Sequence, residues 1–459
     1  MTGHWFIHAA YLAVAVVFIL GLKAMASPAT ARKGIVWAGY AMVAAVVVTL
    51  FWPGMDNRFL IILGILVGGI PAWKSGKSVA MTDMPQMVAI YNGMGGGAAA
   101  AIAAVEFARG EVHGTAITAM AVLGSLIGSV AFSGSCVAWA KLAGKMRKAY
   151  RFPNQQTLNI VLGIVVGWLG LGIVIDGDAW ALAILLFFLA SLALGVVLTT
   201  PIGGADMPVV ISLLNAFTGL AVGFEGYVLG IPALIVAGIV VGASGTLLTL
   251  LMAKAMNRPI RNVLFTPLTG EASEGGEAIE GQMQETSALD AAATMRYAGK
   301  VIVVPGYGMA VAGAQHKVWE MCQLLEEAGV EVAFAIHPVA GRMPGHMNVL
   351  LAEAGVPYDK IFDLEEINND FAQTDVALVI GANDVVNPIA RTDKSSPIYG
   401  MPILNVDQAR SVIVVKRGKG TGYSGVENAL FYKDNCRMLY GSAQEAIADV
   451  IQHVKGMEG

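Results

Sequence analysis

The sequence predicts a polytopic α-helical membrane domain followed by a cytosolic α/β domain with a parallel sheet. Of the 459 residues, 56% are hydrophobic and only 14% are charged, whereas soluble proteins carry about 25% charged residues. The apolar residues are concentrated between Met1 and Val263, while Lys300 to Gly459 has an ordinary soluble composition. We therefore expect a membrane domain at residues 1–262, an acidic linker at 263–299 and a separate α/β domain at 300–459.

Charge and cysteine content exclude several classes of function. The net charge of -4 and the pI of about 6.0 offer no basic face, so nucleic acid is not an expected partner. Cys136, Cys322 and Cys436 are widely spaced and odd in number, which predicts neither a disulfide framework nor a thiolate metal site. The first apolar run lacks a basic leader and a cleavage site, so we interpret it as a retained span.

Nine apolar segments approach the length of about 20 residues that a membrane-spanning helix needs. They are Trp5 to Leu22, Gly34 to Trp52, Asn57 to Trp73, Met84 to Phe107, Thr115 to Ala140, Leu158 to Ile175, Ala179 to Thr199, Met207 to Leu229, and Ile231 to Ala253. Several are rich in glycine and serine, which lets helix backbones approach closely in lipid.

Basic residues predict the orientation of these spans, because cytoplasmic loops retain Lys and Arg. Only Arg58 and Arg109 lie in one set of alternate loops. The opposite set holds thirteen basic residues: Lys23, Arg32, Lys33, Lys74, Lys77, Lys141, Lys145, Arg147, Lys148, Arg151, Lys254, Arg258 and Arg261. This asymmetry places the N-terminus outside the cell and everything after Ala253 in the cytosol.

The C-terminal part shows apolar strands that alternate with amphipathic helices, as in a parallel sheet covered on both faces. The predicted strands are Val301 to Val304, Val332 to Ile336, Val376 to Ile380, Ser411 to Val415 and Ile403 to Val406. Before them, Gly270 to Asp290 holds six acidic and no basic residues and is predicted to be a solvated linker.

A glycine-rich turn directly follows the first predicted strand. Gly306, Tyr307, Gly308, Met309 and Ala310 lead from the strand into a helical stretch that reaches Glu327. A turn in this βαβ context binds the pyrophosphate of a dinucleotide in Rossmann-like domains. Val311 replaces the third glycine of the usual motif, so a merely tight strand-to-helix turn remains an alternative.

Two features favour a phosphorylated dinucleotide. The second strand ends at Ile336 and continues into His337, so it lacks the carboxylate that holds an unphosphorylated ribose in NAD sites. Lys416 and Arg417 follow another strand and precede Gly418, a cationic loop suited to a phosphate. A solvated basic pair at a strand end is the alternative for these two residues.

Three further loops contain more Gly, Pro and Asn than a turn requires. They span Val339 to Asn348, Gly381 to Pro388 and Gly422 to Val426. The second and third follow strands, at the sheet edge where open α/β folds bind ligands. His337 and His346 have no Cys or His partner at metal spacing and are expected to be structural.

Long segments of this sequence resemble the β subunits of proton-translocating NAD(P) transhydrogenases. The resemblance covers essentially the whole chain. It is carried by Pro305 to Val311, His337 to Ala354, Gly381 to Pro388, Lys416 to Gly418, and Ile202 to Pro208. It implies hydride transfer from NADH to NADP⁺, coupled to proton movement across the membrane, by an enzyme of the Si-specific/Re-specific type.

The resemblance also implies which cofactors and partners to expect. NADP(H) binds to this chain in a flipped orientation that exposes the nicotinamide, while NAD(H) binds to a separate α subunit that carries further membrane helices. Dimers of αβ units in a bacterial inner membrane are implied as well. No catalytic side chain is expected, because the hydride passes directly between the nicotinamide rings.

Carried onto this chain, the resemblance assigns four groups of residues to the NADP(H) site. They are the pyrophosphate turn Gly306, Tyr307, Gly308, Met309, Ala310 and Val311; the loop Val339, Ala340, Gly341, Arg342, Met343, Pro344 and Gly345; the loop Gly381, Ala382, Asn383, Asp384 and Val385; and Lys416, Arg417, Gly418, Gly422 and Tyr423, of which the first two clamp the 2′-phosphate.

The proton pathway is expected to involve Asn92, Asp206 and Asn215. Some relatives carry a histidine where this chain has Asn92, and because an amide cannot titrate, a histidine from the partner subunit is implied in its place. Asp206 precedes the eighth span, and boundary carboxylates of this kind are usually functional. An Asp that only caps the following helix is the alternative.

Two other classes of function fit parts of the sequence. A nucleotide-regulated transporter would use the cytosolic domain to control solute flux without hydride transfer. A membrane anchor for a soluble dehydrogenase would tolerate replacement of its apolar part. Neither explains why nucleotide-site loops and polar span residues occur together.

Overall fold

The computed structural model describes residues 4–110, 114–146, 150, 152–176, 181–204, 206–265, 281–343, 345–418, 422 and 424–457. They form two compact units. One contains Met1–Pro201 and Ile211–Leu248, and the other contains Ile202–Val210 and Thr249–Gly459.

Nine helices in the described part of the chain are long and apolar enough to cross a membrane. They are α1 (His4–Met25), α2 (Pro28–Leu50), α3 (Arg58–Ser78), α4 (Met84–Arg109), α5 (Thr115–Leu142), α6 (Gln155–Asp176), α7 (Ala181–Thr199), α8 (Met207–Val228) and α9 (Pro232–Ala255). The nine predicted spans are confirmed, and the chain is a membrane protein.

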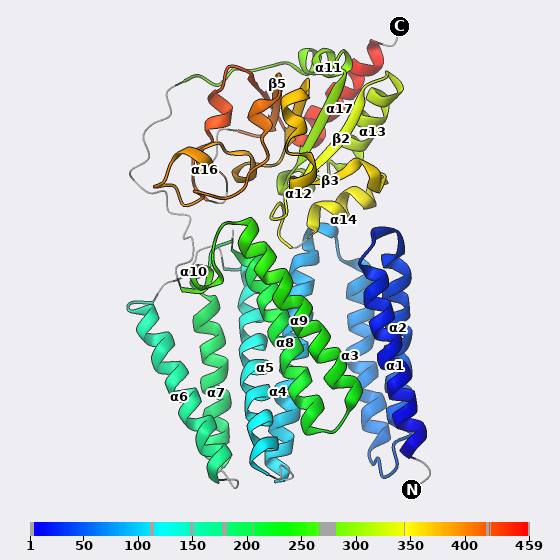
Figure 1. Ribbon diagram of the computed structural model, residues 1–459, viewed down its shortest axis with the longest axis vertical. Coiled ribbons are helices and arrows are strands. Elements are labelled where there is room, and N and C mark those ends of the chain that lie inside the picture. Colours follow the sequence, from blue (N-terminus) through cyan, green and yellow to red (C-terminus); the bar gives the residue numbers. More distant parts are fainter. Residues whose placement is uncertain are drawn as a thin grey trace. The chain divides into compact units, whose positions relative to one another are not determined.

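Helices α4 and α5 pack with their backbones in close contact, which small residues make possible (Figure 1). A Cβ added to Gly96 would lie 2.9 Å from the carbonyl oxygen of Gly128, and one added to Gly128 would lie 2.6 Å from that of Gly96. Any larger residue at either position would push the helices apart, so these two glycines fix the α4–α5 spacing.

The α/β domain is built on a six-stranded sheet whose strands run β3-β2-β1-β4-β5-β6. The strands are β1 (Lys300–Pro305), β2 (Glu331–Ile336), β3 (Ile361–Asp363), β4 (Val376–Ile380), β5 (Ser411–Lys416) and β6 (Cys436–Tyr440). All neighbouring pairs are parallel. This order is that of a doubly wound dinucleotide-binding fold, in which successive strands are added on one side of β1 up to β3 and on its other side from β4 onward.

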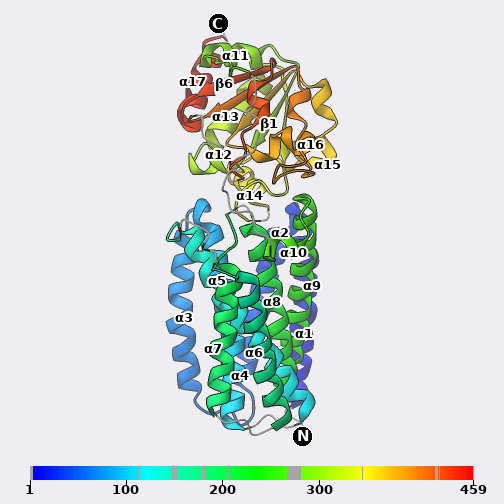
Figure 2. The same cartoon turned by 90° about the vertical axis from the view of Figure 1, so that its left-hand side faces the viewer.

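Helices cover both faces of the sheet (Figure 2). The longer ones are α11 (Ala288–Arg296), α13 (Gln315–Glu327), α14 (His346–Glu353) and α17 (Ala443–Gly456). Shorter elements of the α/β domain are α12 (Tyr307–Val311), α15 (Leu364–Ile367), α16 (Ile389–Thr392), and the 3-10 turns η2 (Tyr358–Lys360), η3 (Asp370–Gln373), η4 (Asp384–Val386), η5 (Val406–Gln408) and η6 (Ala429–Tyr432). Two other short elements flank spans in the sequence: the 3-10 turn η1 (Met81–Asp83) precedes α4, and α10 (Ile260–Phe265) follows α9. Helices α11 and α13 both pack against α17.

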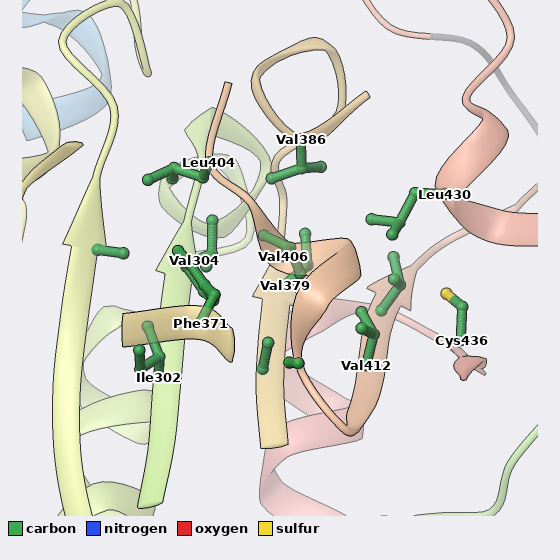
Figure 3. Close-up of a cluster of buried hydrophobic side chains, with 14 of the residues drawn as sticks. Ile302, Val304, Phe371, Val379, Val386, Leu404, Val406, Val412, Leu430 and Cys436 are labelled. Carbon is green, nitrogen blue, oxygen red and sulfur yellow. The ribbon is translucent and has the colours of Figure 1, made fainter. Parts of the chain in front are cut away.

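One face of the sheet buries a continuous apolar cluster (Figure 3). Ile302 and Val304 of β1, Val379 of β4 and Val412 of β5 meet there, and Phe371 is fully buried among them. The middle residues of these strands are all apolar and buried, because a parallel sheet is covered on both faces. The sheet core therefore fixes where β1, β4 and β5 end.

The predicted strand Ile403 to Val406 is wrong. Leu404 and Val406 are buried in the cluster of Figure 3, which explains the strand-like apolar pattern. The N–H of Leu404 bonds the carbonyl of Val385, but the segment belongs to no ladder of the sheet and turns into η5 at Val406. Two short strands, β3 and β6, were not predicted.

Two other segments differ from the sequence-based expectation. The helical stretch expected to reach Glu327 is broken after Val311, where Gly313 adopts a φ of +62° and separates α12 from α13. Within the predicted linker at 263–299, residues 288–296 form α11, whose Ala291, Ala292 and Met295 are buried. Residues 266–280 of that linker lie outside the described residues.

Candidate functional site

A cavity of about 830 Å³ opens at the carboxyl ends of β1, β4 and β5 in the second unit. Its lining combines backbone of glycine-rich loops with the side chains of Arg342, Asp384, Lys416 and Arg417. The volume lies in the range typical of sites for small molecules and cofactors. The β1–β4 junction is also where open α/β sheets bind dinucleotides.

The turn after β1 packs directly against the loop after β4. The N–H of Gly308 donates a hydrogen bond of 3.0 Å to the carbonyl of Gly381. A Cβ added to Gly306 would lie 2.5 Å from the Cα of Ala382, and Gly381 itself adopts a φ of +72°. Glycine at these positions therefore lets the two loops join at the sheet edge, and the joined loops form the floor of the cavity.

The cavity brings together most of the residues that the sequence predicted for the nucleotide. Those at its wall are Gly306, Tyr307, Gly308, Val311, Val339, Ala340, Gly341, Arg342, Gly381, Ala382, Asn383, Asp384, Val385, Lys416, Arg417, Gly418 and Gly422. Met309 and Ala310 are buried in the fold instead, and Met343 and Gly345 lie off the wall. Pro344 and Tyr423 lie outside the described residues.

Sequence reasoning missed other parts of the wall. Within the α/β domain these are Ala312, Pro397, Ile398, Met401, Val415, Ser424, Gly441 and Ala443. Ile398 and Met401 belong to a small buried cluster with Ala390 and Ile403, and no motif marks this loop in the sequence. Ser424 lies in the loop from Gly422 to Val426, which was predicted to bind a ligand. The composition of that loop could therefore have indicated Ser424 as part of the site.

Arg342 is held above an aromatic ring. Its guanidinium carbon lies 4.3 Å from the centroid of the Tyr307 ring, in a cation–π contact. The backbone N–H of Arg342 donates to Nδ1 of the buried His346 at 3.1 Å, and the His346 ring lies 5.7 Å from that of Tyr307. His346 therefore shapes the loop that carries Arg342, as expected for a structural histidine.

Asparagine side chains connect the loop after β4 to the chain before η6. Asn428 donates to the carbonyl of Asn383 at 3.0 Å, and the fully buried Asn387 donates to the carbonyl of Glu427 at 2.9 Å. The side-chain oxygen of Asn387 accepts from the N–H of Ala429. Because each buried amide is satisfied by backbone groups, this corner of the cavity is rigid.

The two basic residues after β5 have different environments. The ammonium of Lys416 lies 4.3 Å from the centroid of the Phe431 ring. Burial lowers the pKa of Lys416 below its ordinary value, although the Glu427 carboxylate opposes this shift. Arg417 is exposed. Both line the cavity, so this loop contributes two basic side chains to its wall.

His337, at the end of β2, occupies the position of the acidic residue in NAD-binding folds. It is buried, its Nδ1 accepts from the N–H of Val339 at 3.2 Å, and its Nε2 lies 2.7 Å from the carbonyl of Pro402. Nε2 therefore carries the proton and donates it. Burial lowers the pKa of His337 to about 4, with the Pro402 bond opposing the shift, so the ring is neutral at physiological pH.

Two of the three residues predicted for the proton pathway, Asn92 and Asn215, lie on spans, and Asp206 directly precedes α8. The Asn92 amide of α4 donates to the Ser135 hydroxyl of α5 at 3.0 Å. Asp206 is fully buried and lies 3.5 Å from the guanidinium of Arg258. Asn215 is exposed on α8. Within the described ranges, no group of His, Cys, Asp and Glu could hold a metal ion.

These features define an integral membrane protein that carries a doubly wound dinucleotide-binding domain. The NAD(P) transhydrogenase beta subunit family matches residues 7–453 of the sequence. Two relatives, both from Rhodospirillum rubrum and both named NAD(P) transhydrogenase subunit beta, are each 46% identical over 457 residues. The matched region covers 97% of this chain and 98% of each relative.

The chain therefore belongs to the NAD(P) transhydrogenase β-subunit family. As a β subunit of a proton-translocating enzyme, it works with an α subunit. The alternatives of a regulated transporter and of a passive membrane anchor are thereby set aside.

Proposed function

We propose that the cavity at the carboxyl ends of β1, β4 and β5 binds NADP(H), and that the α subunit binds NAD(H). The observation that carries this proposal is the charge at the cavity: Lys416 and Arg417 lie at its wall, while the end of β2 bears the neutral His337 in place of a carboxylate. A 2′-phosphate is attracted by the first feature and is not repelled by the second.

NADP(H), when bound, supplies the nicotinamide carbon that accepts or releases the hydride, and the residues of this chain position it. We assign the pyrophosphate to the turn at Gly306–Val311 and the 2′-phosphate to Lys416 and Arg417. The loops at residues 339–345 and 381–385 cover the dinucleotide. Binding in this way leaves the nicotinamide facing the α subunit, which fits a transfer of the Si-specific/Re-specific type between two rings held in contact with water excluded.

Coupling to proton movement is then conformational, since the hydride transfer itself needs no proton from this chain. We propose that Asn92 and Asn215 order water along the path and that Asp206 responds to the proton. Asp206 is fully buried and lies 3.5 Å from Arg258. Protonation of Asp206 would leave the Arg258 guanidinium without this negative counter-charge. The resulting free-energy cost is large enough to shift the equilibrium between two conformations of the protein.

We further propose that the N-terminus lies outside the cell and the α/β domain in the cytoplasm of a bacterium, with the complex assembled as a dimer of αβ units in the inner membrane. The distribution of Lys and Arg between alternate loops supports this orientation.

Reconstitution of this chain with an α subunit in liposomes tests the proposal. NADPH formation from NADH should rise as a pH gradient is imposed in one direction and fall as it is reversed. Asp206→Asn should abolish this response while NADPH binding, measured by calorimetry, remains. A wild-type complex that forms NADPH at a rate independent of the gradient, or a β subunit that prefers NADH to NADPH, would contradict the proposal.

A further inference from the structure

A groove of about 460 Å³ lies between three membrane helices of the first unit, α4, α5 and α7. Its α4 side is built from small residues, among them Gly97, Ala101 and Ala104, which fall on one face of the helix. Ala101 is exposed, so the groove opens outward. Because Ala101 follows Asn92 by nine residues, or about two and a half turns, the groove faces away from the contact between Asn92 and Ser135.

The walls of the groove are apolar. Phe132 of α5 and Phe188 and Leu192 of α7 line them. A Cβ added to Gly97 would lie 2.9 Å from Cδ2 of Phe132, so this ring packs directly on the α4 backbone. Among the described residues that line the groove, Ser129 of α5 carries the one polar side chain.

The Ser129 hydroxyl is buried without a partner. Ser129 is 1% exposed, and its Oγ has no hydrogen-bond partner among the residues that the structure describes. The serines one turn before and after it differ: the Ser125 hydroxyl donates to the carbonyl of Ala121 at 2.7 Å, and the Ser133 hydroxyl donates to the carbonyl of Ser129 at 3.0 Å. A buried hydroxyl without a partner is costly, so Ser129 points to a hydrogen-bonding group from another molecule.

The depth of Ser129 in the membrane indicates what kind of molecule this is. Ser129 is 14 residues from the start of α5 at Thr115 and 13 from its end at Leu142, or about 20 Å from each end. It therefore lies near the middle of a hydrocarbon layer about 30 Å thick. Lipid chains at this depth have no hydrogen-bonding atoms, whereas a neighbouring helix can offer a backbone carbonyl or a polar side chain. The small residues of α4 would let such a helix approach closely.

We infer that a membrane-spanning helix of the α subunit docks in this groove and accepts a hydrogen bond from Ser129. The α subunit is the partner that the family indicates for this chain. The lined part of α4 runs from Met94 to Ala104, about 15 Å or nearly three helical turns, which suits one crossing helix. This contact serves assembly, and it does not depend on which nucleotide the α/β domain binds.

The first test removes only the hydroxyl. In Ser129→Ala, the Kd of the α and β subunits, measured by fluorescence energy transfer between labelled full-length chains in liposomes, should rise about 3- to 15-fold, as for the loss of one interhelical hydrogen bond. The thermal stability of the β subunit alone should not fall. Ser125→Ala, the same change one turn away, should leave the Kd within about twofold of the wild type. Equal Kd values for wild type and Ser129→Ala would overturn the inference.

The second test fills the groove. Ala101→Trp should weaken association of the subunits by at least about tenfold, because the indole would occupy the space of the docked helix. Since Ala101 is exposed, the β subunit should still fold. Ala44→Trp, at an exposed alanine of α2, should associate like the wild type. Normal association of Ala101→Trp would contradict a helix in this groove.

A photo-crosslinking amino acid at position 101 identifies the occupant directly. In the purified αβ complex in liposomes, mass spectrometry should find cross-links between position 101 and a membrane-spanning helix of the α subunit. Cross-links to phospholipid alone would mean that the groove holds lipid chains, and cross-links to a second copy of this chain would make it a contact between β subunits. Either of these two results would refute the docking of an α-subunit helix.

Discussion

Both carboxylate oxygens of Asp384 accept hydrogen bonds from Ser424. Oδ1 accepts the Ser424 hydroxyl at 2.8 Å and Oδ2 accepts its backbone N–H at 3.0 Å. A Cβ added to Gly422 would lie 2.4 Å from Oδ1 of Asp384, so the chain also needs glycine two residues earlier. The loop after β4 and the loop after β5, 40 residues apart in sequence, are thereby joined at the cavity wall.

Ser424→Ala should weaken NADPH binding. The substitution removes the hydroxyl that donates to Asp384 and leaves the loop after β5 held by fewer bonds. Hydrogen bonds to a charged group contribute about 1.5–3 kcal/mol, so the Kd for NADPH should rise about 10- to 100-fold. Calorimetric titration of the detergent-solubilised β subunit with NADPH measures this change.

Ser395→Ala is the matched control for this prediction. The Ser395 hydroxyl and N–H donate to Oδ1 of Asp393 at 2.6 Å and 2.8 Å, so this serine also makes two bonds to an aspartate, but within one loop and away from the residues of the cavity wall. Its NADPH affinity should match the wild type. Equal losses in the two variants would show that the effect is on general stability rather than on the site.

Arg417→Ala should reduce the preference for NADPH over NADH. If the Arg417 guanidinium pairs with the 2′-phosphate, its removal costs about 1.5–3 kcal/mol of binding to NADPH alone. The Kd for NADPH should then rise about 10- to 100-fold while that for NADH changes little. Competition titrations with both coenzymes give the two constants side by side.

Arg410→Ala provides the control for Arg417, because both arginines flank β5, at opposite ends. The Arg410 side chain is 80% exposed and forms an ion pair with Asp375 at 2.9 Å. Both coenzymes should bind to this variant as they do to the wild type. A similar loss of NADPH affinity at Arg410 would mean that net charge, and not a local phosphate contact, sets the preference.

Cys322 and Cys436 should resist thiol reagents in the folded protein. Both side chains are fully buried. Burial raises the pKa of the Cys322 thiol and raises that of Cys436 to about 12, so the reactive thiolate is scarce at neutral pH. Treatment with N-ethylmaleimide followed by peptide mass spectrometry should find both residues unmodified until urea is added. Rapid labelling of either one without urea would show that the α/β domain opens around α13 or β6.

Features that depend on one stretch of sequence were predicted well. The spans were found because about 20 consecutive apolar residues leave few alternatives. The strands β1, β2, β4 and β5 were found because a strand buried on both faces is apolar along its length. The same reasoning failed at Ile403–Val406, since a buried loop in the cluster of Leu404 and Val406 has the same composition as a buried strand.

Features that depend on contacts between distant segments were not predicted. The loops after β1, β4 and β5 could be placed at one sheet edge, because parallel strands end together, but nothing in the sequence pairs Asp384 with Ser424. Glu225 of α8 was overlooked because one acidic residue hardly alters the hydropathy of its span. Its burial, with 1% exposure, and its contact with Gly124 of α5 show that this carboxyl points into the bundle.

Acid should destabilise the α/β domain through His337. Burial lowers the pKa of His337 to about 4 from an ordinary value of 6.5, so between these pH values the unfolded chain binds a proton that the folded domain excludes. The stabilising effect of the neutral ring is therefore complete above pH 6.5 and is lost as the pH falls toward 4. Linkage predicts a loss of about 2 kcal/mol in the free energy of unfolding by pH 5.

Pulse proteolysis of the full-length chain across a urea series, at neutral pH and at pH 5, measures that free energy for the α/β domain. His337→Asn should be less stable than the wild type at neutral pH, because the bonds to Pro402 and Val339 are disturbed, and the difference should shrink by about 2 kcal/mol at pH 5. His453→Asn, at an exposed histidine of α17, should track the wild type at both pH values. If the difference in unfolding free energy between wild type and His337→Asn is the same at neutral pH and at pH 5, the buried ring does not exclude the proton. His337 would then not be a neutral group at the end of β2.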